Sequence, residues 1–335
     1  MQYYQLTDIL KTGLKIAICA LCLFGSKVST GQSEGTLLPM SNKLLLNPSF
    51  AGLSGSSDMW TGVQFFSNSG QEANHLFSLT YDHYSEKLKG GVGWFFYQGI
   101  DGKNNSGFTG AGLAYAKSVY TSDAGNLIAS ANLNSFIYTK QLYGYTSERL
   151  ATDSDDYKQI NTDPFRKYNE LLPRIGLVWS SSTIQTGISF SNPVRFFNGQ
   201  KPTHDEYSDY ISVFSISKKF EGIQQGLLSK PYMTEPEIVI LLSDRQFVIR
   251  TGIKLEHTKN NFGLFLLNNI SDEMHGLTGL IGWNIKNIKI NFSGGCLYSL
   301  PLQTFSFNGE AFIGVVIPEI HFNEDKPWRP SEKLF

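Results

Sequence analysis

The serine, histidine and acidic side chains that carry most enzyme chemistry do not stand at the spacings of common catalytic or metal sites in this chain. The six histidines are scattered, and no pair has metal-ligand spacing. No G-x-S-x-G nucleophile elbow occurs, because Gly52-Leu53-Ser54-Gly55 has the wrong spacing. No glycine-rich loop of the kind that binds nucleotide phosphates occurs either. Spacing does not exclude a hydrolase that assembles Ser and His from separate strands, but the sequence favours a protein without enzyme activity, metal or cofactor.

One acidic segment could in principle bind calcium. It contains Asp153-Ser154-Asp155-Asp156, followed by Asp163-Pro164. Calcium loops need oxygen ligands at regular alternate positions and a glycine for the sharp turn. No glycine lies within this acidic stretch. The pattern therefore favours a solvated surface loop over a calcium site.

The elements that must carry these side chains are strands, because apolar and polar residues alternate from near Met59 almost to the end of the chain. Successive side chains of a strand point to opposite faces, so each segment has one apolar and one polar side. Repetition of this pattern predicts an all-β fold, a transmembrane antiparallel β-barrel of about 14 strands. Its predicted lipid-facing residues are Ile184, Ile188, Ile249, Ile253, Ile281 and Ile290, and its predicted lumen-facing residues are Gln185, Arg250, Lys254, Asn284 and Asn291.

Composition agrees with a barrel and argues against a nucleic-acid partner. Charged residues make up 17% of the chain, below the ~25% of soluble domains, because a lipid-facing wall removes half of each strand from the positions open to charge. The net charge of −1 offers no attraction for a polyanion. A barrel of this size must hold water, a plug or a ligand in its lumen.

Four parts are expected along the chain. Residues 1–31 read as a signal peptide, with Lys11 and Lys15 before a short apolar stretch; a retained anchor helix is the alternative. Residues 32–57 form an amino-terminal plug or periplasmic segment, 58–317 the outer-membrane barrel, and 318–335 a periplasmic tail.

The amino-terminal segment contains three leucines before a proline. A residue before proline avoids the α region, so a helical turn through Leu44–Leu46 should end at Asn47. These leucines need a dry site, which the barrel mouth or lumen would offer.

The connections between strands are predicted to be longer outside the cell than in the periplasm, as in other barrels. The longest run from Tyr143 to Leu171 and from Asn192 to Tyr207. The connection from Glu221 to Glu235 breaks this rule, because it is long but falls on the periplasmic side.

Asn47-Pro48-Ser49-Phe50-Ala51-Gly52 resembles the Asn-Pro-x-Tyr-Ala-Gly motif of the PorP/SprF family of Bacteroidota, with Phe50 in place of tyrosine. These are outer-membrane barrels associated with the type IX secretion system. In that family the motif stands shortly after the signal peptide and just before the first strand, as here. The motif residues carried over are Asn47, Pro48, Phe50, Ala51 and Gly52, and weaker similarities lie at Trp60–Gln64, Gly90–Gly93, Pro173–Leu177 and Gly187–Pro193.

The resemblance implies a non-enzymatic role in the Gram-negative outer membrane, in protein secretion or gliding motility. The partner would be an adhesin or other large secreted protein, with periplasmic or outer-membrane secretion components as further partners. Long loops on a rigid barrel are where such binding residues collect, and tyrosine and arginine are common interface anchors. The candidates in the longest loop are Tyr157, Phe165, Arg166 and Tyr168. A transport channel for small or hydrophobic solutes is the alternative.

Overall fold

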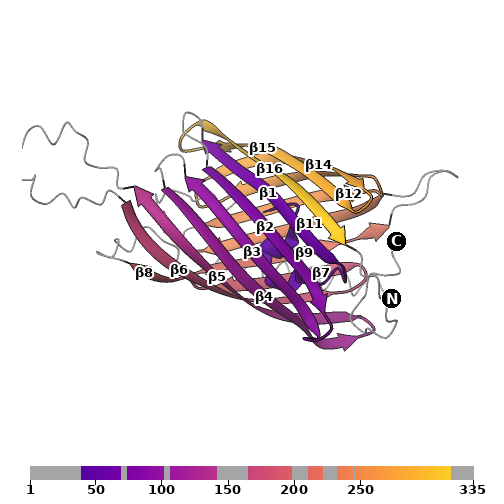
Figure 1. The fold of residues 1–335 in the computed structure, drawn as a ribbon. Helices are drawn as coiled ribbons and strands as arrows, with labels where there is room; N and C mark the ends of the chain where they lie inside the picture. Colours follow the sequence, from indigo (N-terminus) through magenta and orange to yellow (C-terminus); the bar gives the residue numbers. More distant parts are fainter. Residues whose placement is uncertain are drawn as a thin grey trace, which may run out of the picture. The chain divides into compact units, whose positions relative to one another are not determined.

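A computed structural model of the protein describes residues 39–68, 74–101, 106–141, 165–197, 210–221, 232–244 and 246–317. Within these ranges the strands form one antiparallel sheet, and the last strand pairs with the first to close it into a barrel (Figure 1). The helical elements described are α2 (Lys43–Leu46) and the 3-10 turn η1 (Pro48–Phe50). Neither of them has the length or hydropathy to cross a membrane. The strands are β1 (Ser57–Asn68), β2 (Asn74–Ser85), β3 (Gly90–Asp101), β4 (Ser106–Ser122), β5 (Gly125–Gln141), β6 (Phe165–Ser180), β7 (Ile184–Ser191), β8 (Val194–Phe197), β9 (Ile211–Lys218), β10 (Phe220–Glu221), β11 (Met233–Ser243), β12 (Phe247–Glu256), β13 (Asn260–Asn269), β14 (Met274–Ile285), β15 (Ile288–Ser299) and β16 (Thr304–Ile317).

The sixteen strand segments of the described chain make fourteen passes along the barrel wall. Strand β8 continues β7 beyond the Asn192-Pro193 interruption, and both pair with β6. Strand β10 likewise continues β9 beyond Lys219, and both pair with β11. The prediction of a barrel of about 14 strands is confirmed.

Alternation separates an apolar outer face from a more polar inner face. Ile188, Ile253 and Ile281 are 51%, 42% and 40% exposed on the outside. Arg250, by contrast, is 1% exposed and faces the lumen, as does Asn291. The inward or outward orientation predicted for these side chains is confirmed.

Aromatic side chains also enter the lumen. Phe95 and Tyr97 of β3 stack with ring centroids 6.0 Å apart, and Phe95 is buried. The lumen is therefore partly filled by the barrel's own side chains.

Three predicted connections are shorter than expected. Strand β6 begins at Phe165, so the longest loop does not reach Leu171. Strand β8 lies within the predicted 192–207 loop, and β10 and β11 shorten the 221–235 connection. The predictions failed here because they relied on alternation of apolar and polar side chains. Strand ends outside the lipid do not need an apolar face, so the alternation is lost there although backbone hydrogen bonding between the strands continues.

The two ends of the barrel are called the turn end and the loop end below. The turn end carries Ser57 and Ile317, where the barrel begins and finishes, and the loop end is the opposite one. At the loop end, β6 pairs with β5 as far as Phe165 opposite Gln141. Strand β7 pairs with β6 as far as Arg174, and its continuation β8 pairs with β6 as far as Tyr168. The hairpin of β5 and β6 therefore extends beyond this neighbour only from Phe165 to Lys167.

Arginine at Ile188, which lies midway along β7 on the outer face, should destabilise the folded barrel in a bilayer by ~2–4 kcal/mol. The cost arises because a guanidinium would enter hydrocarbon without a partner. Chemical unfolding in liposomes measures it, with Ile188→Leu as the control. A neutral Ile188→Arg change would contradict the outward assignment of this face.

Candidate functional site

Residues 39–56, called the plug segment below, lie against the inner wall of the barrel. Its two short helical elements are each started by an asparagine side chain. The Asn42 Oδ1 accepts a hydrogen bond from the Leu44 N–H at 3.0 Å, and the Asn47 Oδ1 accepts one from the Ser49 N–H at 2.9 Å. Helix α2 ends at Asn47, as predicted, because Pro48 disfavours the α conformation in the residue before it.

The leucines of the plug segment fasten it to two opposite parts of the wall. Leu46 packs in a buried cluster with wall residues of β9, β11 and β12, including Val213 and Val239. Leu44 packs in a second cluster with wall residues of β3, β4 and β5, including Phe95. The segment therefore bridges the lumen.

Asn47 fits a socket in the wall that glycines leave open. Its Nδ2 donates to the backbone oxygens of Leu177 and Ile188, at 3.2 Å and 3.0 Å. A Cβ atom added to Gly176 would overlap the Asn47 Oδ1, and one added to Gly187 would lie 3.1 Å from its Nδ2. Only a wall without side chains at these positions admits the asparagine.

The backbone of Ala51 and Gly52 also lies very close to the wall. Gly52 adopts a φ of +62°, and its N–H donates to the Asp82 Oδ2 at 2.6 Å. Ala51 is buried, and a Cβ added to Gly91 of β3 would overlap its carbonyl oxygen. Glycine is needed in the motif for its positive φ and in the wall for space.

The first residues of the plug segment meet charged groups of the wall. The Arg250 Nη1 donates to the Pro39 oxygen at 3.0 Å, while its Nη2 pairs with Glu237 at 2.7 Å. Glu310 accepts from the Met40 N–H at 3.1 Å and from the Ser41 Oγ at 2.8 Å. Burial of these groups is tolerated because Arg250 is paired with Glu237 and Glu310 is hydrogen-bonded.

Lys43 links the plug segment to the wall at the turn end. Its Nζ lies 2.6 Å from the Glu235 Oε1 and 3.0 Å from the Gln185 Oε1. Burial alone would lower the pKa of Lys43, but the carboxylates of Glu235 and Glu237 outweigh burial and raise that pKa. The lysine is therefore fully charged at neutral pH.

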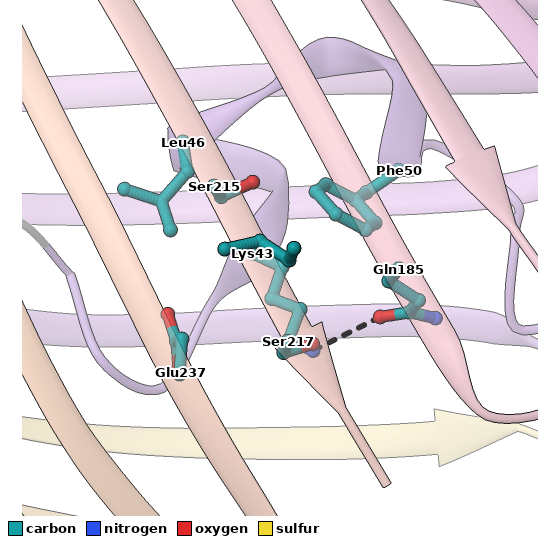
Figure 2. A pocket seen from close by; sticks show the side chains of 8 residues that line it. Lys43, Leu46, Phe50, Gln185, Ser215, Ser217 and Glu237 are labelled. Carbon is teal, nitrogen blue, oxygen red and sulfur yellow. Dashed lines mark hydrogen bonds between the residues drawn. The ribbon is translucent and has the colours of Figure 1, made fainter. Parts of the chain in front are cut away.

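A small pocket, partly open to solvent, surrounds this lysine (Figure 2). It is lined by residues of the plug segment and of the wall strands β7, β9 and β11. Its lining residues are Lys43, Leu46, Phe50, Gln185, Ser215, Ile216, Ser217 and Glu237.

The predicted site residues fall into two groups. The motif residues Asn47 to Gly52 are brought together inside the barrel. Phe165, Arg166 and Tyr168 were expected in a loop but belong to strand β6, where they pair with Gln141, Lys140 and Tyr138. Tyr157, the acidic stretch from Asp153 and the signal peptide lie outside the described residues.

Sequence reasoning missed the ion pairs that hold the plug segment. The sequence predicted that the Arg250 side chain faces the lumen, but it did not predict that Glu237 is its partner. Glu235 and Glu237 alternate with outward residues along β11, and this spacing is a signal that could have identified them as lumen residues. Among the described residues, no group of three or more His, Cys, Asp or Glu side chains could hold a metal ion.

Of three solved structures that resemble this chain, one matches with a TM-score above 0.5. The monoaromatic hydrocarbon channel CymD matches with a TM-score of 0.54 and 11% identity, over 89% of this chain and 96% of that one. The toluene transporter TbuX of Ralstonia pickettii matches with a TM-score of 0.46 and 13% identity, over 82% and 93%. CdiB from Acinetobacter baumannii matches with a TM-score of 0.45 and 9% identity, over 78% of this chain but 60% of its own. At these identities the likeness is one of fold alone.

No curated protein sequence matches the chain at a significant level. The profile of the family described as "Type IX secretion system membrane protein PorP/SprF" matches residues 39–313. That match begins at the first described residue of the plug segment and covers nearly the whole barrel, including the Asn47–Gly52 motif. The chain therefore belongs to the PorP/SprF family of type IX secretion system membrane proteins.

Proposed function

We propose that this protein is a non-enzymatic barrel of the Bacteroidota outer membrane that assists type IX secretion, or holds a large secreted partner such as an adhesin at the cell surface. Family membership supports the link to type IX secretion. The observation that carries the proposal is the plug segment, which bonds to opposite parts of the inner wall and obstructs the lumen. A barrel obstructed in this way is better suited to bind a partner at its ends than to pass solutes.

The obstruction is held by contacts of several kinds. Leu44 and Leu46 bury apolar surface against different strands, and Asn47 bonds to the backbone of β6 and β7. Arg250 and Glu310 of the wall bond to the backbone of Pro39 and Met40. Removal of the segment would take these hydrogen bonds from the buried side chains of Arg250 and Glu310, which is costly in a lumen of low dielectric constant.

Partner binding is assigned to the loop end, where the hairpin of β5 and β6 extends beyond β7 and its continuation β8 from Phe165 to Lys167. We retain Tyr157, Phe165, Arg166 and Tyr168 as the candidate partner-binding residues. An extended hairpin raises residues above the membrane surface, where a large partner can reach them.

Deleting residues 147–163, which leaves β6 intact, should abolish surface display of the partner while the barrel still assembles. Surface immunolabelling of the partner measures display, and heat-modifiable gel migration reports assembly. Deletion of residues 223–230 at the turn end is the matched control. If the partner is still displayed after the loop deletion, it is held by residues outside 147–163, and Phe165, Arg166, Tyr168 and the turn-end connection become the next candidates.

The alternative function is transport of small or hydrophobic solutes. It draws support from the similarity in fold to CymD, a monoaromatic hydrocarbon channel, and from the pocket beside Lys43. Planar-bilayer recording separates the two functions. A plugged attachment barrel should give no steady single-channel current, whereas steady current would favour transport.

A further inference from the structure

The pocket at the turn end is built to hold a positive charge. Glu235 and Gln185 each place an oxygen on the Lys43 ammonium, at 2.6 Å and 3.0 Å. The Phe50 ring lies 6.0 Å from the same nitrogen and offers its negative face. Ser215 and Ser217 add hydroxyl groups to the lining (Figure 2). The acceptors and the ring therefore come from both the wall and the plug segment.

Glu235 contacts the Lys43 ammonium beside this pocket, and its carboxylate is fixed on the wall, whereas the ammonium is not. The Glu235 side chain is 6% exposed and belongs to β11. The Lys43 side chain is 34% exposed, stands on a flexible four-carbon stem and extends from a helix of four residues. Glu237, the next inward-facing residue of β11, is already paired with Arg250. An incoming cation could therefore replace Lys43 as the ion-pair partner of Glu235.

We propose that this pocket is a binding site for a primary ammonium group, filled at rest by Lys43, and that the lysine side chain of a periplasmic partner can replace Lys43 there. The ligand class follows from the present occupant, because three N–H donors on a slender stem fit between Glu235, Gln185 and Phe50. Replacement would remove the Lys43 contact from the middle of the plug segment, while the contacts of Pro39–Ser41 and of Asn47–Gly52 remain. The inference concerns the turn end and does not depend on which partner binds at the loop end.

The experiment uses n-butylammonium as the probe and the accessibility of position 44 as the readout. Leu44 belongs to the plug segment and is buried against the wall, so Leu44→Cys, in a chain carrying Cys296→Ser, reports loosening by its rate of maleimide labelling. Lys43→Ala should raise that rate about tenfold, the equivalent of one hydrogen bond to a charged group. Adding n-butylammonium should lower the rate of Lys43→Ala, because the amine fills the vacated site.

The same amine should act in the opposite direction on the chain that keeps Lys43, because it displaces the lysine and raises labelling. At saturation the two labelling rates should converge. Lys43→Met should be loosened but not restored by the amine, since its side chain occupies the space of the stem. Glu235→Gln should not respond to the amine, and tetramethylammonium, which has no N–H donors, should have no effect on any of these proteins.

Heat-modifiable gel migration verifies that each protein is folded, and the Lys43-containing chain tests displacement even where a variant fails to fold. An unchanged labelling rate on adding n-butylammonium to the Lys43-containing chain would overturn the proposal. Equal effects of tetramethylammonium and n-butylammonium would also overturn it, because they would reduce the site to general charge screening.

Discussion

Replacing Arg250 with methionine is expected to lower the free energy of unfolding of the barrel by about 3–5 kcal/mol. Arg250 is 1% exposed, and its guanidinium joins the Glu237 carboxylate to the Pro39 oxygen at 2.7 Å and 3.0 Å. It also lies over the Phe265 ring, 5.4 Å from the ring centre. Methionine fills much of the space but leaves Glu237 buried without its cation. Urea unfolding in liposomes, followed by tryptophan fluorescence, measures the loss.

The matched control is the double variant Arg250→Met with Glu237→Met, which removes both charges. It should recover much of the stability, because the main cost of the single change is an uncompensated buried carboxylate. Proteolysis of the plug segment in the folded protein should also increase for the single variant, since Pro39 loses its anchor. Equal stabilities of the single variant and the natural protein would show that the pair does not stabilise the barrel.

Gly91→Ala is expected to displace the plug segment from the wall of the folded barrel. An added Cβ would overlap the carbonyl group of Ala51, and a backbone group cannot rotate away as a flexible side chain can. Overpacking of this kind costs roughly 3 kcal/mol. The barrel can avoid that cost only by releasing Ala51 and Gly52, and the released segment becomes accessible to protease.

Gly279→Ala provides the control, because a Cβ at Gly279 of β14 would have no heavy atom within 4 Å. Both changes add one methyl group to a strand glycine, so intrinsic strand propensity cancels in the comparison. Limited proteolysis and mass spectrometry should locate new cleavage within residues 39–56 for Gly91→Ala alone. Equal protection of the two variants would mean that the wall glycine does not position the motif.

The barrel could be predicted from the sequence because its information is local. Alternation of Ile249 and Ile253 with Arg250 and Lys254 is visible in one strand, and it gave the correct face for these residues. Local signals were weaker where a strand leaves the membrane. Phe165 to Leu171 therefore resembled a loop, although the residues from Phe165 belong to β6.

The site could be predicted only in part, because its contacts join segments far apart in the sequence. The Asn-Pro-x-aromatic-Ala-Gly motif was recognised, but its socket at Gly91, Gly176 and Gly187 was not. Which glycine faces the motif depends on how several strands are staggered, and strand patterns do not determine that stagger. The pairing of Arg250 with Glu237 likewise depends on the register between β11 and β12.

The most direct test of the central claim is affinity purification of the intact protein from outer membranes, followed by mass spectrometry. Mild detergent and a matched strain that lacks the protein define the background. An attachment barrel of the PorP/SprF family should retain a large type IX secreted surface protein, and deletion of residues 147–163 should lose it. Recovery of the folded barrel without any such partner, from cells that display type IX substrates normally, would contradict the account.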